Sequence, residues 1–188
     1  MRRLAVAILA ALALAGCGAA DEGQAPPPTL AAGTLPELDS RSRILNVGGL
    51  AVDAFRPTEF ARFLEDAGFV SGREREFSGK SRMWDRVVAR TLLFESDDGA
   101  RAYVDWLERH AEDLLGKAAP AEWSAPGGAG VAFVLVPCAS CKKELPTFFA
   151  GWRRDAIVAT LLAAGSGANE SRFAELTRRL DVRVQVRS

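Results

Sequence analysis

Two cysteines form the motif whose residue types and spacing point most directly to chemistry. Cys138 and Cys141 lie in the segment Cys138-Ala139-Ser140-Cys141, with two residues between the thiols. Such a pair can close a small disulfide, exchange disulfides with another protein, or supply half of a metal site. In an oxidising compartment the closed disulfide would stabilise the fold by roughly 2 kcal/mol on the loop-entropy model, and the sequence favours this structural role.

Residues 131–146 resemble the active-site segment of membrane-tethered thioredoxin-like oxidoreductases, because an apolar stretch leads into the C-x-x-C pair and a charged segment ending in Leu-Pro follows it. The resemblance implies that Cys138 attacks disulfides as a thiolate at the start of a helix and that Cys141 resolves the mixed disulfide. The chain departs from the family at Pro137, which replaces the usual tryptophan, and no later proline supplies the family's cis-proline. We therefore expect residues 137–147 to be a loop between two strands.

The other candidate catalytic residues have simpler structural explanations. His110 is the single histidine and falls on the apolar face of a predicted helix, which argues against a histidine-rich metal site and favours a packed side chain. Asp97 and Asp98 form a carboxylate pair, but they follow Ser96 where a helix is expected to begin, and capping accounts for them. The glycine-rich segment 127–130 precedes a strand, whereas phosphate-binding loops follow one. We expect no metal, no cofactor and no enzymatic activity.

The third cysteine closes the run Leu14-Ala15-Gly16-Cys17, which follows two arginines and an apolar stretch that begins at Leu4. This stretch is shorter than the roughly 20 residues that cross a bilayer, so a cleaved signal peptide fits better than a spanning helix. The run resembles the lipobox of bacterial lipoproteins. The resemblance implies that residues 1–16 are removed and that acyl chains, among them palmitate, hold Cys17 on the extracytoplasmic face of the cell membrane, or in an outer membrane where the source has two membranes.

The remaining chain divides into a tether and one domain. Residues 17–40 contain the lipidated cysteine and a stretch rich in proline, alanine and glycine without aromatics, which we expect to be disordered. Residues 41–188 are long enough for a single domain with its own core. The full chain has 24 basic and 24 acidic residues. Losing two arginines with the signal leaves a small acidic excess, so we expect no basic field for nucleic acid or anionic lipid. We also expect a monomer.

Hydrophobic periodicity predicts an α+β domain with an antiparallel sheet, about three packed helices and the order α-β-β-α-β-β-α-β. Helices are expected at 57–67, where Gly68 follows as a cap, at 97–115, and around the anchors Phe173, Leu176 and Leu180. Strands are expected at 70–77, 84–94, 131–136, 152–162 and, from its strict alternation, 181–187, with a short strand or irregular cover at 44–52.

An internal repeat is suggested by two tryptophan-led segments. The strand that begins at Trp152 repeats the pattern of the strand that begins at Trp84, with one residue inserted, and each is followed by a helix with similarly spaced apolar anchors. We interpret this as a possible duplication of a strand-helix unit within one domain, and chance similarity between two alanine- and leucine-rich stretches is the alternative.

Three predicted strands, 87–94, 131–136 and 156–163, are apolar at nearly every position, so both of their faces should leave water. Either the helices divide between the two faces, or the sheet curls around an apolar cavity. The tether and the α+β layout of residues 44–187 resemble lipoproteins and kinase sensor domains of actinobacterial envelopes. That resemblance implies an apolar or envelope-derived ligand, or an envelope protein, as partner.

The sequence therefore favours a membrane-tethered, extracytoplasmic and non-enzymatic lipoprotein that binds a ligand or takes part in envelope interactions. Thiol-disulfide exchange by Cys138 and Cys141 is the alternative function.

Overall fold

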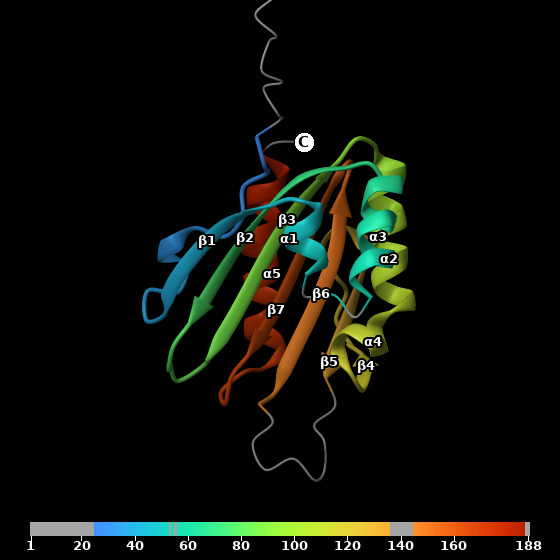
Figure 1. Ribbon diagram of the computed structural model, residues 1–188. Helices are drawn as coiled ribbons and strands as arrows, with labels where there is room; N and C mark the ends of the chain where they lie inside the picture. Colours follow the sequence, from blue (N-terminus) through green and yellow to red (C-terminus); the bar gives the residue numbers. More distant parts are fainter. Residues whose placement is uncertain (1–24, 53, 55, 136–144, 187–188) are drawn as a thin grey trace, which may run out of the picture.

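The computed structural model describes residues 25–52, 54, 56–135 and 145–186. Its strands form one antiparallel sheet in the order β1-β2-β3-β7-β6-β5-β4 (Figure 1). The strands are β1 (Asp39–Leu45), β2 (Phe69–Ser78), β3 (Arg86–Phe94), β4 (Ala118–Pro120), β5 (Gly130–Leu135), β6 (Thr147–Arg154) and β7 (Ile157–Ala164). The helices are α1 (Val47–Ala51), α2 (Pro57–Asp66), α3 (Asp97–Arg109), α4 (Ala111–Leu115) and α5 (Glu170–Gln185), with 3-10 turns at Ala32–Thr34 and Pro126–Gly128. The predicted α+β class with an antiparallel sheet is confirmed.

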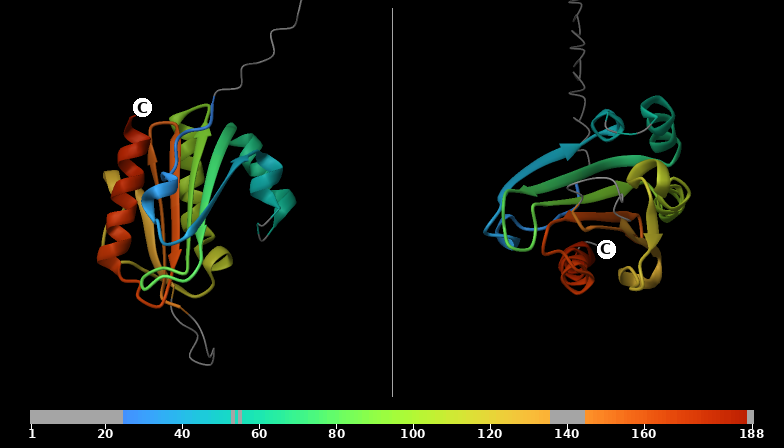
Figure 2. Two further views of the ribbon diagram at one scale, coloured as in Figure 1. Left: turned by 90° about the vertical axis from the view of Figure 1, so that its left-hand side faces the viewer. Right: turned by 90° about the horizontal axis from the view of Figure 1, so that it is seen from below.

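The helices divide between the two faces of the sheet. Helix α5 packs on one face, and α1 to α4 pack on the other, as Figure 2 shows from two directions. Trp152 and Phe173 are fully buried in the core beneath α5, while Leu64 and Leu92 are fully buried in the core beneath α1 to α4. The central strands β3, β6 and β7 lie between these cores, which explains why they are apolar on both faces.

The ordered part of the chain begins earlier than we expected. We predicted a disordered tether through residue 40, but the side chains of Thr29 and Leu30 are buried on the α5 face. Thr91 Oγ1 donates a hydrogen bond to the carbonyl of Pro27 at 3.0 Å, and Thr29 Oγ1 donates to the carbonyl of Ala89 at 3.3 Å. The prediction failed because it used the average composition of the segment, whereas a few leucines scattered among its prolines and glycines pack into the core. The hydrogen bonds also satisfy the buried hydroxyls of the two threonines.

The predicted strand at 181–187 is wrong, because helix α5 continues to Gln185. Leu180 and Val184 extend the buried stripe of this helix by one more turn, with both side chains fully buried. The alternating valines on either side, Val182 and Val186, are 60% and 82% exposed, so the alternation does not mark a strand with one buried face.

The segment 152–162, predicted as one strand, is instead a hairpin. Strand β6 ends at Arg154, Asp155 takes a positive φ of 47° in the turn, and β7 returns antiparallel beside it. Trp152 therefore lies inside β6, whereas Trp84 precedes β3, and the two tryptophans are not equivalent. Each hairpin, β2-β3 and β6-β7, is followed by a helix, but the two helices cover opposite faces of the sheet.

The bounds of the remaining helices lie closer to those predicted from the sequence. Helix α2 begins at Pro57 as expected, and Gly68 after its end has the positive φ of 69° that a left-handed cap requires. The predicted helix 97–115 is divided at His110 into α3 and α4. The segment 44–52 contains the end of β1 and the short helix α1. Over the described ranges, no helix combines the length and the apolarity that crossing a bilayer would need.

Candidate ligand-binding groove

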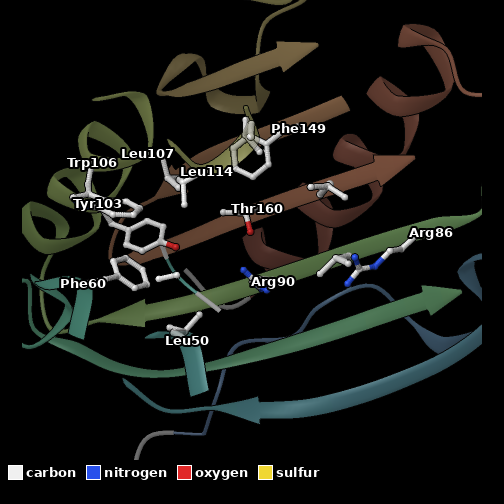
Figure 3. Close-up of a pocket in the computed structure, with 14 residues that line it drawn as sticks. Leu50, Phe60, Arg86, Arg90, Tyr103, Trp106, Leu107, Leu114, Phe149 and Thr160 are labelled. Atoms are coloured by element: carbon white, nitrogen blue, oxygen red, sulfur yellow. The ribbon is translucent and has the colours of Figure 1, made fainter. Parts of the chain in front are cut away.

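A groove of about 330 Å³ lies between the sheet and the helices α1 to α4 (Figure 3). Its volume falls in the lower part of the roughly 300–1,000 Å³ range of small-molecule sites. Helices supply an apolar wall, and strands β3, β6 and β7 supply the floor. The wall consists of Leu50, Ala54, Phe60, Tyr103, Trp106, Leu107, Leu114 and Leu115, and the floor consists of Arg86, Val88, Arg90, Phe149, Thr160 and Leu162.

The wall is held together by aromatic rings of α2 and α3. The ring of Phe60 lies 4.5 Å from that of Trp106 between centroids, and the ring of Phe63 lies 5.6 Å from it. The two helices approach closely where Gly99 meets the carbonyl of Ala67, since a Cβ at Gly99 would lie 2.0 Å from that oxygen. This contact fixes the start of α3 against the end of α2 and therefore the position of the wall.

One row of residues in register crosses the sheet at the floor of the groove. Arg90 of β3 pairs in register with Thr160 of β7, which pairs in register with Gly151 of β6. A Cβ at Gly151 would lie 2.7 Å from Cδ1 of Leu107, so the glycine leaves room for this wall residue to pack down on the sheet.

Two arginines of β3 form the polar part of the groove. Arg90 Nε donates to Oε2 of Glu74 at 2.5 Å, and Arg86 Nε donates to Oε1 of Glu76 at 2.7 Å. Glu74 also accepts a hydrogen bond from Nε of Arg43 at 2.7 Å. Burial by itself raises the pKa of Glu74, but the hydrogen bond from Arg43 and the charge of Arg90 outweigh it, and the pKa lies below its ordinary value.

These residues belong to a charged surface that continues from the groove across β3, β2 and β1. We call it the arginine strip; its charged members are Arg41, Arg43, Glu74, Glu76, Arg86 and Arg90. The strip has four arginines and two glutamates, so it carries an excess of two positive charges although the chain as a whole is neutral.

Two hydroxyl groups lie between the arginines and the apolar wall. The hydroxyls of Tyr103 and Thr160 point into the groove from opposite sides (Figure 3). Tyr103 is 4% exposed and Thr160 is 6% exposed, and neither hydroxyl has a hydrogen-bond partner among the residues that the structure describes. Burial raises the pKa of Tyr103 to about 12, and the nearby charge of Arg90 opposes that rise.

The candidate catalytic residues identified from the sequence lie outside this groove. His110 stacks on Trp106 with 4.5 Å between ring centroids, and its Nδ1 lies 2.9 Å from the carbonyl oxygen of Trp106, so it packs as expected. The backbone of Gly99 donates to Oγ of Ser96 at 3.1 Å, which confirms the predicted helix cap. Asp97 forms ion pairs with Arg153 and Arg101 rather than facing a second carboxylate.

Cys17, Cys138 and Cys141 lie outside the described residues, and the lipidation, disulfide and redox hypotheses stay predictions. The strands on either side of the C-x-x-C segment are β5 and β6, which pair antiparallel with Leu135 opposite Thr147. In the described ranges no cluster of three or more histidine, cysteine, aspartate or glutamate side chains could hold a metal ion.

Sequence reasoning missed Arg86, Arg90, Tyr103 and Thr160 as a site. One signal was present, since Arg90 interrupts the buried run of β3 between Ala89 and Thr91. A charge inside a strand that is otherwise apolar on both faces indicates a polar partner or a ligand.

No model of a known protein family matches the chain, and no curated protein matches it. Among solved structures, the extracellular domain of PknH from Mycobacterium tuberculosis is weakly similar, with a TM-score of 0.47 and 11% sequence identity over 78% of each chain. A match at this level bears on neither the ligand nor the activity of the present chain.

Proposed function

We propose that the protein is a non-enzymatic, extracytoplasmic binding domain that holds an apolar ligand in the groove. The observation that carries this proposal is the open space between an aromatic wall and a floor of otherwise buried strands. Apolar surface that leaves water contributes about 25 cal/mol per Å², so a ligand that fills the space gains affinity from the wall alone.

The chemistry of the lining supports binding rather than catalysis. The lining residues within the described part of the chain are apolar, hydroxyl-bearing or guanidinium-bearing, and none carries a carboxylate, a thiol or an imidazole. General acid-base catalysis uses a carboxylate or an imidazole most often, and a hydroxyl such as that of Thr160 becomes a nucleophile when an adjacent base activates it.

We further propose that acyl chains on Cys17 attach this domain, as a monomer, to the cell membrane or to an outer membrane. The support is the run Leu14-Ala15-Gly16-Cys17 behind a basic and apolar leader, which fits a lipoprotein signal peptide.

The binding proposal is tested by filling the groove. Leu162 lines the groove and is only partly buried, so we expect Leu162→Trp to project its indole into the open space. The purified protein should bind a polarity-sensitive fluorescent dye and should carry a co-purifying lipid in native mass spectrometry, and Leu162→Trp should weaken both.

The matched control is Val182→Trp, because Val182 is 60% exposed on α5, on the opposite face of the sheet. We expect it to bind the dye like the unaltered protein, with circular dichroism showing that both variants are folded. Equal dye binding by the two variants, or no binding by the unaltered protein, would rule out the groove as the site.

A further inference from the structure

We propose, building on the binding function above, that the groove takes a single-chain anionic amphiphile, an acyl chain ending in a carboxylate or a phosphate. Its charged head lies at Arg86 and Arg90, and its tail lies beneath Phe60, Trp106 and Leu107. The proposal thus assigns a polar end and an apolar end to one ligand.

The orientation of the two guanidinium groups supports a bound anion. Each arginine uses its Nε to bond a glutamate of β2, at 2.5 Å for Arg90 and 2.7 Å for Arg86. In the part of the chain that the structure describes, the terminal nitrogens of both groups have no acceptor. A guanidinium held at Nε presents its remaining donors as a fork, and this fork matches the oxygens of a carboxylate or a phosphate.

The charge of the surrounding surface also favours an anion. Glu74 forms ion pairs with both Arg43 and Arg90, and Glu76 forms one with Arg86, so both carboxylates of the arginine strip already have cationic partners. Arg41 adds a fourth positive charge to the strip. An anionic head at Arg86 and Arg90 would reduce the repulsion that this positive excess creates.

The hydroxyls of Tyr103 and Thr160 offer two further hydrogen-bond donors to the head group. Both side chains are more than nine-tenths buried, and both hydroxyls point into the groove without a partner among the described residues (Figure 3). The oxygens themselves are open to the groove, since the unpartnered buried side-chain atoms of the described residues belong to Arg73, Arg75 and Trp123, so both hydroxyls can donate to a ligand. Thr160 lies directly opposite Arg90 in the register of β3 and β7, so one head-group oxygen could accept from both residues.

The size of the groove limits the tail to one chain. Its volume of about 330 Å³ is near the lower bound of the roughly 300–1,000 Å³ that small-molecule sites span. A phospholipid with two acyl chains would need a larger apolar space than the wall residues enclose.

The test compares ligands that differ in the head alone. Palmitate, hexadecanol and a monoacyl glycerol phosphate are titrated below their aggregation concentrations against the protein with dye bound, and displacement is measured. We expect both anions to bind at least about tenfold more tightly than the alcohol, as expected when a charge-assisted hydrogen bond is gained. The anion that binds more tightly identifies the source, a free fatty acid or a phospholipid fragment.

Single substitutions test which residues bind the charged head group of the ligand. Arg90→Gln and Arg86→Gln should each weaken palmitate about tenfold and change hexadecanol binding little, and Tyr103→Phe should weaken both anions. The side chain of Arg86 is 59% exposed, so we expect Arg86→Gln to fold. This variant keeps the test usable even if Arg90→Gln does not fold. Arg41→Gln is the matched control, since Arg41 belongs to the arginine strip but does not line the groove.

Equal affinity for palmitate and hexadecanol, or anion binding that Arg86→Gln and Arg90→Gln leave unchanged, would overturn the inference while the binding function stands. Failure of all three ligands and of the dye would overturn the binding function itself.

Discussion

The indole Nε1 of Trp152 donates a hydrogen bond to Oδ1 of Asp181 at 2.9 Å, and both side chains are buried. Arg154 donates to both oxygens of the same carboxylate, at 2.9 Å from Nε and 2.8 Å from Nη2. Gln185 donates to Oδ2 at 2.8 Å. One carboxylate on α5 therefore collects donors from β6 and from the next turn of its own helix, which fixes this helix on the sheet.

Asp181→Ala should lower the free energy of unfolding by about 3 kcal/mol, because it leaves a buried indole N–H and a guanidinium without their acceptor. Urea denaturation followed by circular dichroism measures this change. The control is Glu175→Ala, which removes surface ion pairs with Arg172 and Arg179 on the same helix and should shift the midpoint little. Similar shifts for the two variants would contradict a structural role for the buried pair.

Glu74 should make the stability of the protein depend on pH in the acid range. Because its pKa is lower in the folded state than the ordinary value near 4.3, folding favours the ionised form. That stabilisation is fully present above about pH 4.3 and is lost as the pH falls through the folded pKa.

Glu74→Gln should therefore be less stable than the unaltered protein at neutral pH, by about 1–2 kcal/mol, and the difference should shrink in acid. Urea midpoints measured for both proteins over a series of pH values give the comparison, with Glu76→Gln as a more exposed neighbour. A difference that stays constant down to low pH would refute the assignment.

Tyr103 can be titrated directly, because it is the single tyrosine of the chain. Its pKa of about 12 exceeds the ordinary value near 10, so tyrosinate absorbance should rise about two pH units later than in the unfolded chain. The folded state favours the neutral phenol, and this stabilisation is present below about pH 10 and is lost as the pH rises toward 12. Ultraviolet absorbance against pH measures the shift, and a midpoint near 10 in the folded protein would show that the ring is not buried.

The hypothesis that Cys17 is lipidated can be tested through cleavage of the signal peptide. Globomycin, which blocks the lipoprotein signal peptidase, should cause the unprocessed precursor to accumulate, and Cys17→Ser should release the protein from the membrane fraction. Immunoblots of fractionated cells measure both effects. Normal processing and unchanged membrane association in both experiments would favour an uncleaved N-terminal helix instead.

The C-x-x-C pair should behave as a structural disulfide. We expect a reduction potential well below the roughly −270 mV of thioredoxin and no insulin-reductase turnover. Equilibration with glutathione buffers of known potential, followed by thiol alkylation and mass spectrometry, gives the value. A readily reduced pair, with turnover that Cys138→Ser abolishes, would instead support the oxidoreductase function.

The elements that could be predicted are those whose signals are local. Helix α2 has a proline at its start, a regular apolar stripe and Gly68 at its end, and the structure reproduces all three. The turn at Asp155 was missed because it contains neither glycine nor proline and lies inside an apolar run. The last turns of α5 were missed because their stability depends on Trp152 and Arg154, which are distant in sequence from Asp181.

The groove was predictable only in outline. Strands that are apolar on both faces suggested covered faces or a cavity, and the structure contains both covered faces and a groove. The polar residues of the groove could not be grouped from the sequence, because Arg90, Tyr103 and Thr160 meet only through strand register and helix packing.

The packed N-terminal segment shortens the stretch of chain that would link a lipidated Cys17 to the domain. The carbonyl of Thr29 accepts a hydrogen bond from Nε of Arg183 at 2.6 Å, so the chain is held beside the C-terminal end of α5 (Figure 1). From Cys17 to Ala25 even a fully extended chain reaches only about 29 Å, at roughly 3.6 Å per residue. A lipid on Cys17 would therefore keep Ala25 within about 29 Å of the bilayer surface, with this end of the domain toward the lipid and the start of β6 away from it.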